Sequence, residues 1–254
     1  EASLLGGVSE NPNITATGDV NVRAKSVDNL SLIAINFSAA AGGASVGAGG
    51  SVLVFQNAVK AQLSGNVHSG GDVTVAAESD ETLVNFIASV SISGSTAVGG
   101  AAIVTYFKGS TTANILDGSV INAAGDILLT AESSELVTAD GIGLTGGAGA
   151  AVNGMVDVIV TSVRTTAETK SSVSLTGETV SVEASDDYEL VGVAASVSVS
   201  GSAGVGVTAI VTVAGNTITA GLGSNNTVTT NSGDVTVKAE SDRKIVNTAA
   251  TVAG

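Results

Sequence analysis

The chain has no cysteine and no tryptophan, a single histidine and a single proline, and aromatic residues at only 2% of its 254 positions. Without cysteine it has no disulfide framework, no thiolate metal site and no cysteine nucleophile. The one histidine, His68, excludes most histidine-based metal sites and argues against a catalytic triad. Lys and Arg number only 9 against 23 Asp and Glu, so the net charge is −14. Because nucleic-acid binding depends on basic side chains that meet phosphates, we expect no nucleic-acid partner.

The chain is rich instead in small aliphatic residues and glycine. Hydrophobic residues make up 44% of the sequence, too many for a disordered chain, and 33 residues are glycine. With so few aromatic residues, the core must be built from thin layers of small side chains. No apolar run approaches the roughly 20 residues of a membrane-spanning helix, so we expect no membrane insertion by this segment.

An internal repeat organises the whole sequence. Its anchors are Gly18-Asp19, Gly71-Asp72, Gly125-Asp126, Gly177-Glu178 and Gly233-Asp234. Subtracting the glycine numbers gives spacings of 53, 54, 52 and 56 residues. The sequence begins and ends inside a repeat, and Ala2 to Leu5 matches the strand that precedes an anchor. We therefore treat residues 1–254 as one repetitive domain and expect it to be a fragment of a longer chain.

Apolar and polar residues alternate after each anchor. In the second repeat Val84, Phe86, Ala88, Val90 and Ile92 share one face, and mostly polar residues occupy the other. This period of two is typical of strands, and the abundant Val, Ile and Thr favour them. Since no segment shows sustained helical periodicity, the sequence predicts an all-β fold.

Repeats of this size, stacked in series, favour a β-solenoid. Two coils of about 26 residues would fill one repeat. With one coil per repeat, the acidic anchor residues would crowd at about 4.8 Å, whereas two coils separate them to about 9.6 Å. We therefore predict two coils per repeat. The alternative is a row of antiparallel hairpins, in which Val84–Ile92 and Val98–Phe107 pair around a turn near Gly94-Ser95.

Three recurring features resemble the repeats of giant bacterial surface adhesins. They are Gly-Asp-Val-Thr-Val-x-Ala-Glu-Ser, the following Ile/Leu-Val-Asn-x-x-Ala-x-Val, and a Gly/Ala-rich link to a Val-rich strand. The resemblance is to the filamentous-haemagglutinin type and, more closely, to leukotoxin-like filamentous adhesins. It implies a right-handed parallel β-helix, type V secretion (autotransporter or two-partner), location at the bacterial cell surface, and a role in adhesion and virulence. The third repeat departs from the pattern, because Asp140 and Gly141 interrupt its long strand.

Two acidic segments, which we place in turns, are the best candidates for a site. They contain Glu78, Asp80 and Glu81 in one repeat and Glu183, Asp186 and Asp187 in another. Carboxylates on turns bind Ca²⁺ through oxygen ligands, but the calcium-binding nonapeptide and the EF-hand loop are both absent. We assign no metal-binding residue and no cofactor, with Ca²⁺ as the alternative, and interpret these segments as a solvated edge that opposes sheet pairing.

Catalysis is not expected, and we assign no catalytic residue. A sugar-cleaving site needs carboxylates at set separations beside aromatic or basic residues, which are few and scattered here. Gly49-Gly50, Gly99-Gly100 and Gly146-Gly147 lack the Lys-Ser/Thr of a phosphate loop and indicate close packing or a bend within a strand. His68 and Tyr188 fall in segments interpreted as turns, where we expect exposure.

The sequence therefore predicts a structural segment, part of the shaft of a secreted adhesin that projects a distal binding region. Its partners would be host or bacterial surface proteins or glycans, contacted through other parts of the parent chain. One alternative is a binding module whose solenoid face engages a glycan or protein. Another is a self-assembling extracellular fibre, because open solenoid ends associate end to end or edge to edge.

Overall fold

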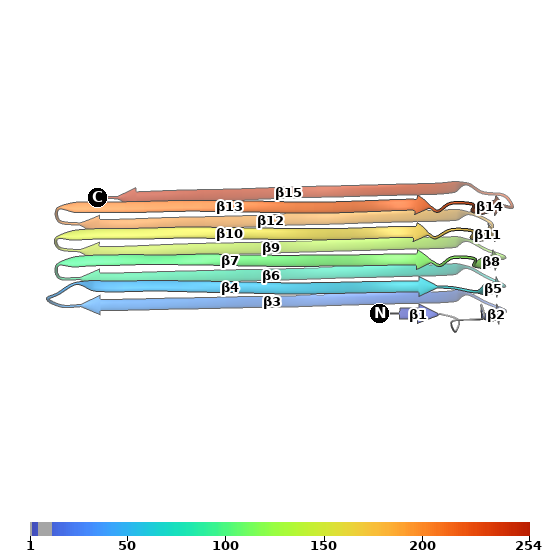
Figure 1. The fold of residues 1–254 in the computed structure, drawn as a ribbon, viewed down its shortest axis with the longest axis horizontal. Coiled ribbons are helices and arrows are strands. Elements are labelled where there is room, and N and C mark those ends of the chain that lie inside the picture. Colours follow the sequence, from blue (N-terminus) through green and yellow to red (C-terminus); the bar gives the residue numbers. More distant parts are fainter. Residues whose placement is uncertain (1, 5–11) are drawn as a thin grey trace.

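The computed structural model describes residues 2–4 and 12–254, and within them the chain forms strands and turns but no helix. The strands form three parallel sheets, and the hydrogen-bonded neighbours within each sheet come from successive repeats. The molecule is a parallel β-solenoid (Figure 1), which confirms the predicted fold class.

Each coil consists of two long strands and one short strand. The first long strands form sheet C: β3 (Val20–Ala40), β6 (Val73–Ser93), β9 (Ile127–Gly147), β12 (Val180–Ser200) and β15 (Val235–Ala253). Sheet A contains β1 (Ala2–Leu4), β4 (Ser45–Leu63), β7 (Thr96–Ile115), β10 (Ala150–Thr169) and β13 (Ala203–Leu222). The short strands form sheet B: β2 (Asn13–Ala16), β5 (Asn66–Ser69), β8 (Val120–Ala123), β11 (Ser174–Gly177) and β14 (Thr227–Thr230).

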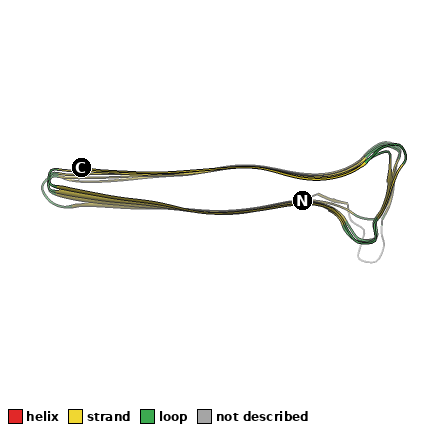
Figure 2. Cartoon of the chain, turned by 90° about the horizontal axis from the view of Figure 1, so that it is seen from above, coloured by secondary structure: helices red, strands yellow, loops and turns green. Residues whose placement is uncertain are grey.

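The coil is flat and elongated. The chain runs along sheet C, reverses at a tight turn, returns along sheet A and crosses one end of the coil on the short strand of sheet B. Figure 2 shows two long strands facing each other in a narrow layer that widens into a triangle where sheet B lies. We call this wide end the base.

The strand register shows one coil per repeat, so the prediction of two coils is wrong. Val20 pairs with Val73, Val73 with Ile127, Ile127 with Val180, and Val180 with Val235. These offsets are 53, 54, 53 and 55 residues, one full repeat each time. Strand length is the reason, because a first long strand alone takes 21 residues in most coils. At about 3.3 Å per residue, each coil is about 70 Å broad yet adds only about 4.8 Å to the stack.

Hydrogen bonds between coils allow the anchor carboxylates to stack at this short spacing. Asp19 Oδ1 accepts a hydrogen bond from the N–H of Asp72 at 3.0 Å, and Asp72 Oδ1 accepts one from the N–H of Asp126 at 2.9 Å. Each charge is thus met by an amide of the next coil. A Cβ at Gly71 or Gly125 would overlap the carboxylate oxygen, so the glycine of the anchor makes room for the aspartate of the preceding coil.

The fourth anchor lies one residue later than predicted. The register places Thr179 at the aspartate position and Glu178 at the glycine position, so Gly177-Glu178 is not the structural anchor. The N–H and the hydroxyl of Thr179 both donate to Asp126 Oδ1, at 3.1 and 2.7 Å. Thr179 therefore bonds to the preceding coil, but it supplies no carboxylate to the coil that follows.

Two apolar clusters fill much of the interior. The cluster at the base combines side chains from all three sheets, among them Val75, Leu129 and Ile121. The second lies between sheets A and C and includes Ile87 and Phe107, which are fully buried. Burial of this apolar surface is the main favourable term in folding.

Beyond the second cluster the usual pattern is reversed, with polar residues inside and apolar residues outside. The face of Val84, Phe86, Ala88, Val90 and Ile92 points to solvent, and small polar side chains point inward. The inner hydroxyls bond across the layer, as between Ser38 and Ser45 (2.7 Å) and between Ser45 and Ser91 (3.0 Å), and also between successive coils of one sheet, as between Thr145 and Ser198 (2.8 Å). The alternating sequence pattern showed which residues share a face of the strand, but it did not show which of the two faces is buried.

Neither the interruption predicted at Asp140 and Gly141 nor the antiparallel hairpin around Gly94-Ser95 is present in the structure. β9 runs unbroken through Asp140 and Gly141, and a Cβ at Gly141 would overlap Met155 Cε on sheet A. The turn near Gly94-Ser95 is present, but β6 and β7 lie in different sheets, so they are not an antiparallel hairpin. At the N-terminus, Ala2–Leu4 pairs with the end of β4, whereas Leu5 lies outside the described residues.

We expect the Gly125→Ala substitution to lower the free energy of unfolding by about 1 kcal/mol, because the new Cβ displaces the Asp72 carboxylate from the N–H of Asp126. The matched control is Gly18→Ala in the first coil, where a Cβ meets no heavy atom within 4 Å. Urea unfolding of both variants measures the difference. Equal losses in the two variants would contradict this role for the anchor.

Candidate functional site

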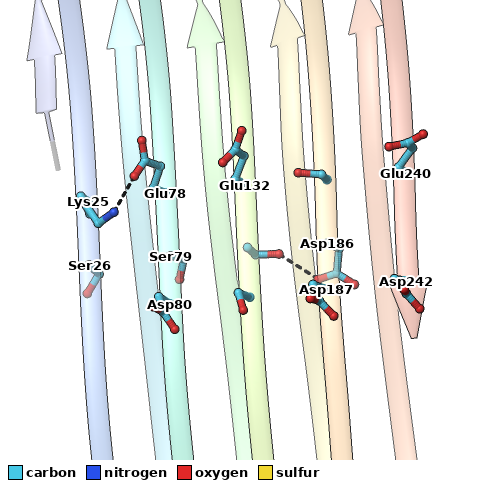
Figure 3. A pocket seen from close by; sticks show the side chains of 13 residues that line it. Lys25, Ser26, Glu78, Ser79, Asp80, Glu132, Asp186, Asp187, Glu240 and Asp242 are labelled. Carbon is cyan, nitrogen blue, oxygen red and sulfur yellow. Dashed lines mark hydrogen bonds and ion pairs between the residues drawn. The ribbon is translucent and has the colours of Figure 1, made fainter. Parts of the chain in front are cut away.

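The outer face of sheet C carries an acidic groove near the base (Figure 3). Its outward-facing lining residues include Lys25, Glu78, Asp80, Glu132, Asp187, Glu240 and Asp242. The parallel register produces the groove, because it places Glu78 directly beside Glu132 and Asp187 directly beside Asp242. Equivalent positions of successive coils thus form two acidic rows, with adjacent strands about 4.8 Å apart and with Ser185 and Ser134 interrupting the carboxylates.

Two cations partly offset this charge, Lys25 beside Glu78 and Lys238, whose Nζ lies 2.8 Å from Glu240 Oε1. Lys25 Nζ donates to Glu78 Oε2 at 2.8 Å, and this hydrogen bond and the Glu78 charge raise the pKa of Lys25. The pair is exposed and contributes little stability. Glu132, Asp187 and Asp242 form no ion pair with any described residue. The groove therefore has the electrostatic character of a surface that attracts cationic partners.

The inner face of the same sheet carries a second group of carboxylates, the inner acidic belt of Glu81, Glu135 and Asp186. Glu81 and Glu135 are direct neighbours on adjacent strands. Asn57 Nδ2 donates to Glu81 Oε1 at 2.5 Å, and Asn216 Nδ2 donates to Asp186 Oδ2 at 2.8 Å. All three carboxylates are buried, so the belt is closed to substrates.

Burial and mutual repulsion favour the protonated forms of two members of this belt, Glu81 and Glu135. Burial, together with the charges of Asp186 and Glu81, raises the pKa of Glu135 to about 10. Burial also raises the pKa of Glu81, against hydrogen bonds from Ser79 and Asn57 that lower it. A neutral carboxyl costs less to bury than a carboxylate, which is why Glu81 and Glu135 are compatible with the folded interior.

A further buried carboxyl, Asp157, lies on β10 between sheets A and C. Neither of its oxygens has a hydrogen-bond partner among the described residues. Burial, with a smaller effect of the nearby Asp140 charge, raises the pKa of Asp157 to about 7. This carboxyl therefore titrates near neutral pH inside the coil.

Tyr188 is fully buried, so the prediction of an exposed tyrosine in a turn is wrong. It occupies the inward position next to Glu135 in the strand register, and its hydroxyl lies 2.7 Å from Thr161 Oγ1. Burial raises the pKa of Tyr188 to about 12. The guanidinium of Arg243 lies 5.7 Å from the centre of the ring.

The acidic segments predicted as turns are parts of continuous strands. Because side chains alternate along a strand, Glu78 and Asp80 point outward and Glu81 points inward. Likewise Asp187 points outward and Asp186 inward, while Glu183 accepts a 2.5 Å hydrogen bond from the Ser181 hydroxyl. These two sequence clusters are each divided between the two faces of the sheet, and they also lie two coils apart.

No group of three or more His, Cys, Asp or Glu side chains in the described residues is placed to hold a metal ion. His68 is exposed on β5, as predicted. A Cβ at Gly49 would overlap Asn36 and one at Gly99 would overlap Thr145, which confirms close packing at these two glycines. At Gly50 and Gly146 a Cβ would meet no heavy atom within 4 Å, so the prediction of close packing is wrong there.

Sequence reasoning missed Glu135, the most strongly perturbed carboxyl of the belt. The sequence did contain an indication of its position. Residues an even number of positions after the first strand residue that follows an anchor point inward. Glu81 lies eight residues after Val73, and Glu135 lies eight residues after Ile127. Counting in steps of two is valid only if the strand continues unbroken through the acidic segment. Because that segment was interpreted as a turn, the count was not carried through it.

Comparisons with known proteins give no relative for this chain. No protein-family model, curated protein or solved structure matches it. In the part of the chain that the structure describes, no helix has the length and hydrophobicity needed to cross a membrane.

We expect the Asp157→Asn variant to raise Tm at pH 8 by about 2–4 °C and to leave Tm unchanged at pH 4. A raised pKa means that the folded chain binds the proton more tightly than the unfolded chain. The stability from neutral Asp157 is therefore complete below about pH 4 and is lost as the pH rises through about 7. Thermal unfolding at both pH values measures this, with the exposed Asp80→Asn as control. An equal rise in Tm at pH 4 would contradict titration as the cause.

Proposed function

We propose that this chain is a structural segment of the shaft of a secreted bacterial surface adhesin. The observation that carries the proposal is the register, in which every repeat closes one coil and presents the same hydrogen-bonding edge to the next. Such coils add in series, and nearest-neighbour contacts supply their stability. The resemblance of the repeats to filamentous adhesins supports type V secretion and a place at the cell surface.

The coil geometry sets how such a shaft would work. Each repeat of about 53 residues adds about 4.8 Å to the stack, so about 1,000 residues would project about 90 Å. In this proposal other parts of the parent chain contact host or bacterial surface proteins or glycans, and this segment spaces them from the cell. The role is mechanical, with no chemical step assigned to the acidic groove or to the inner acidic belt.

A chain with one extra unit, made by repeating residues 73–126 after Asp126, tests addition in series. We expect one additional coil, seen in small-angle scattering or electron microscopy as about 4.8 Å of extra stack thickness at unchanged breadth. The free energy of unfolding should rise with the added interface. A particle that becomes broader instead of thicker, or an added repeat that unfolds separately, would contradict the proposal that coils add in series to form a shaft.

Direct binding assays separate a shaft from a binding module. We expect the 254-residue chain to give no signal above background on glycan arrays or cultured host cells, and antibodies against it to label intact cells of the source bacterium. Saturable binding that a charge-reversing Glu132→Lys/Asp187→Lys variant abolishes would favour a binding module that uses the acidic groove.

A further inference from the structure

The outer part of each coil is almost free of charge. We call this part the blade and define it as residues 31–54, 84–106, 138–160, 191–213 and 246–254. Asp140 and Asp157 are its only charged residues, in a chain whose net charge is −14. The charged surface is therefore confined to the base and the adjoining strands, and the blade offers apolar side chains to water.

The outer face of sheet A in the blade, which we call the valine face, is the most uniform apolar surface. Four coils contribute five outward positions each, and the twenty residues comprise 13 Val, 3 Ala, 3 Gly and Tyr106. Val46, Val52 and Val54 are 60–70% exposed, and Val156 and Val207 are 41% and 59% exposed. Such a contiguous apolar surface is unusual on an isolated monomer.

We propose that the valine face packs against the valine face of a second copy of this chain. Nine residues at about 3.3 Å across four strands about 4.8 Å apart give about 600 Å² per copy. The pair would bury about 1,200 Å² in total, the lower limit of stable protein interfaces. A flat sheet face of this kind packs face to face at about 10 Å from another sheet.

The glycines of the valine face indicate a protein sheet rather than lipid as the occupant. A Cβ at Gly50 or Gly154 would meet no heavy atom within 4 Å, and neither residue has a positive φ, so the coil itself does not require glycine there. Glycine inside a strand weakens it and commonly marks the close approach of another backbone. These positions lie in two adjacent rows of mostly Gly and Ala between rows of valine, so they form a shallow groove, which Val156 and Val207 interrupt. Acyl chains gain nothing from such a groove, whereas a second sheet interdigitates with it.

Charge favours an antiparallel pair. A two-fold axis that lies in the plane of the interface, perpendicular to the strands, makes the interface self-complementary and places the two charged bases at opposite ends. Separated by far more than the Debye length of about 8–10 Å, the bases no longer repel one another appreciably. Association of this kind should persist in high salt, because burial of apolar surface drives it.

Sedimentation equilibrium of the 254-residue chain and two variants on the central strand β10 tests the proposal. We expect the wild type to form dimers, and Gly154→Val to weaken dimerisation about tenfold or more by filling the groove. Because valine suits an exposed strand position better than glycine, Tm should stay equal or rise. Val156→Lys should also weaken dimerisation about tenfold or more by placing a charge in the interface.

Matched controls isolate the valine face. Gly215→Val lies on the outer face of sheet A beyond the blade, where a Cβ also meets open space, and Val199→Lys lies on the outer face of sheet C in the blade. Both should dimerise like the wild type. A wild type that stays monomeric to about 300 µM, well above typical specific affinities, overturns the proposal, as does flotation of that monomer with phosphatidylcholine vesicles. Dimers unaffected by both β10 variants would also overturn it, because they would point to pairing of the open coil edges.

Discussion

The hydrogen-bonded ladder between successive coils is the constraint on which the rest of the structure depends. Each long strand pairs along almost its whole length with the equivalent strand one repeat away. Because the register is one full repeat, identical positions fall into rows across the stack. The anchor aspartates, the acidic groove, the inner acidic belt and the valine face are all rows of this kind. A residue that recurs in each sequence repeat therefore forms a row of neighbouring side chains across the stack.

The ladder also determines which side-chain chemistry is tolerated inside the coil. An inward charge between the two sheets is buried away from bulk solvent, so buried carboxyls either find donors or hold protons. Asp186 follows the first course through Ser133 and Asn216, and Glu135 follows the second, with its pKa raised to about 10. Near the turns, serine hydroxyls pair across the interior, and the aliphatic residues are left outside. The blade exposes apolar side chains because polar side chains occupy its interior.

Much of the fold was predictable from spacing and alternation. The repeat, the all-β class and the solenoid follow from the Gly-Asp anchors and the period of two. The number of coils was not predictable from charge repulsion, because Asp19 and Asp72 are bonded to amides of the next coil instead of facing each other as bare charges. The fourth anchor was misplaced by one residue, because Thr179 occupies the aspartate position there and donates two hydrogen bonds to Asp126. Which face of an alternating strand is buried depends on the partner sheet, so the valine face could not be predicted from one strand alone.

The most direct test of the account is a cross-link between neighbouring coils, which the absence of native cysteine makes simple. Thr82 and Leu136 are direct partners on β6 and β9. The Thr82→Cys/Leu136→Cys variant should therefore form an intrachain cross-link with a short bifunctional maleimide, since paired strands lie about 5 Å apart. Thr82→Cys/Lys108→Cys places the two thiols on sheets C and A, on opposite outer faces of the coil, and should not cross-link. Efficient cross-linking of the second pair without the first would show that two shorter coils fill each repeat, and would contradict the one-coil account.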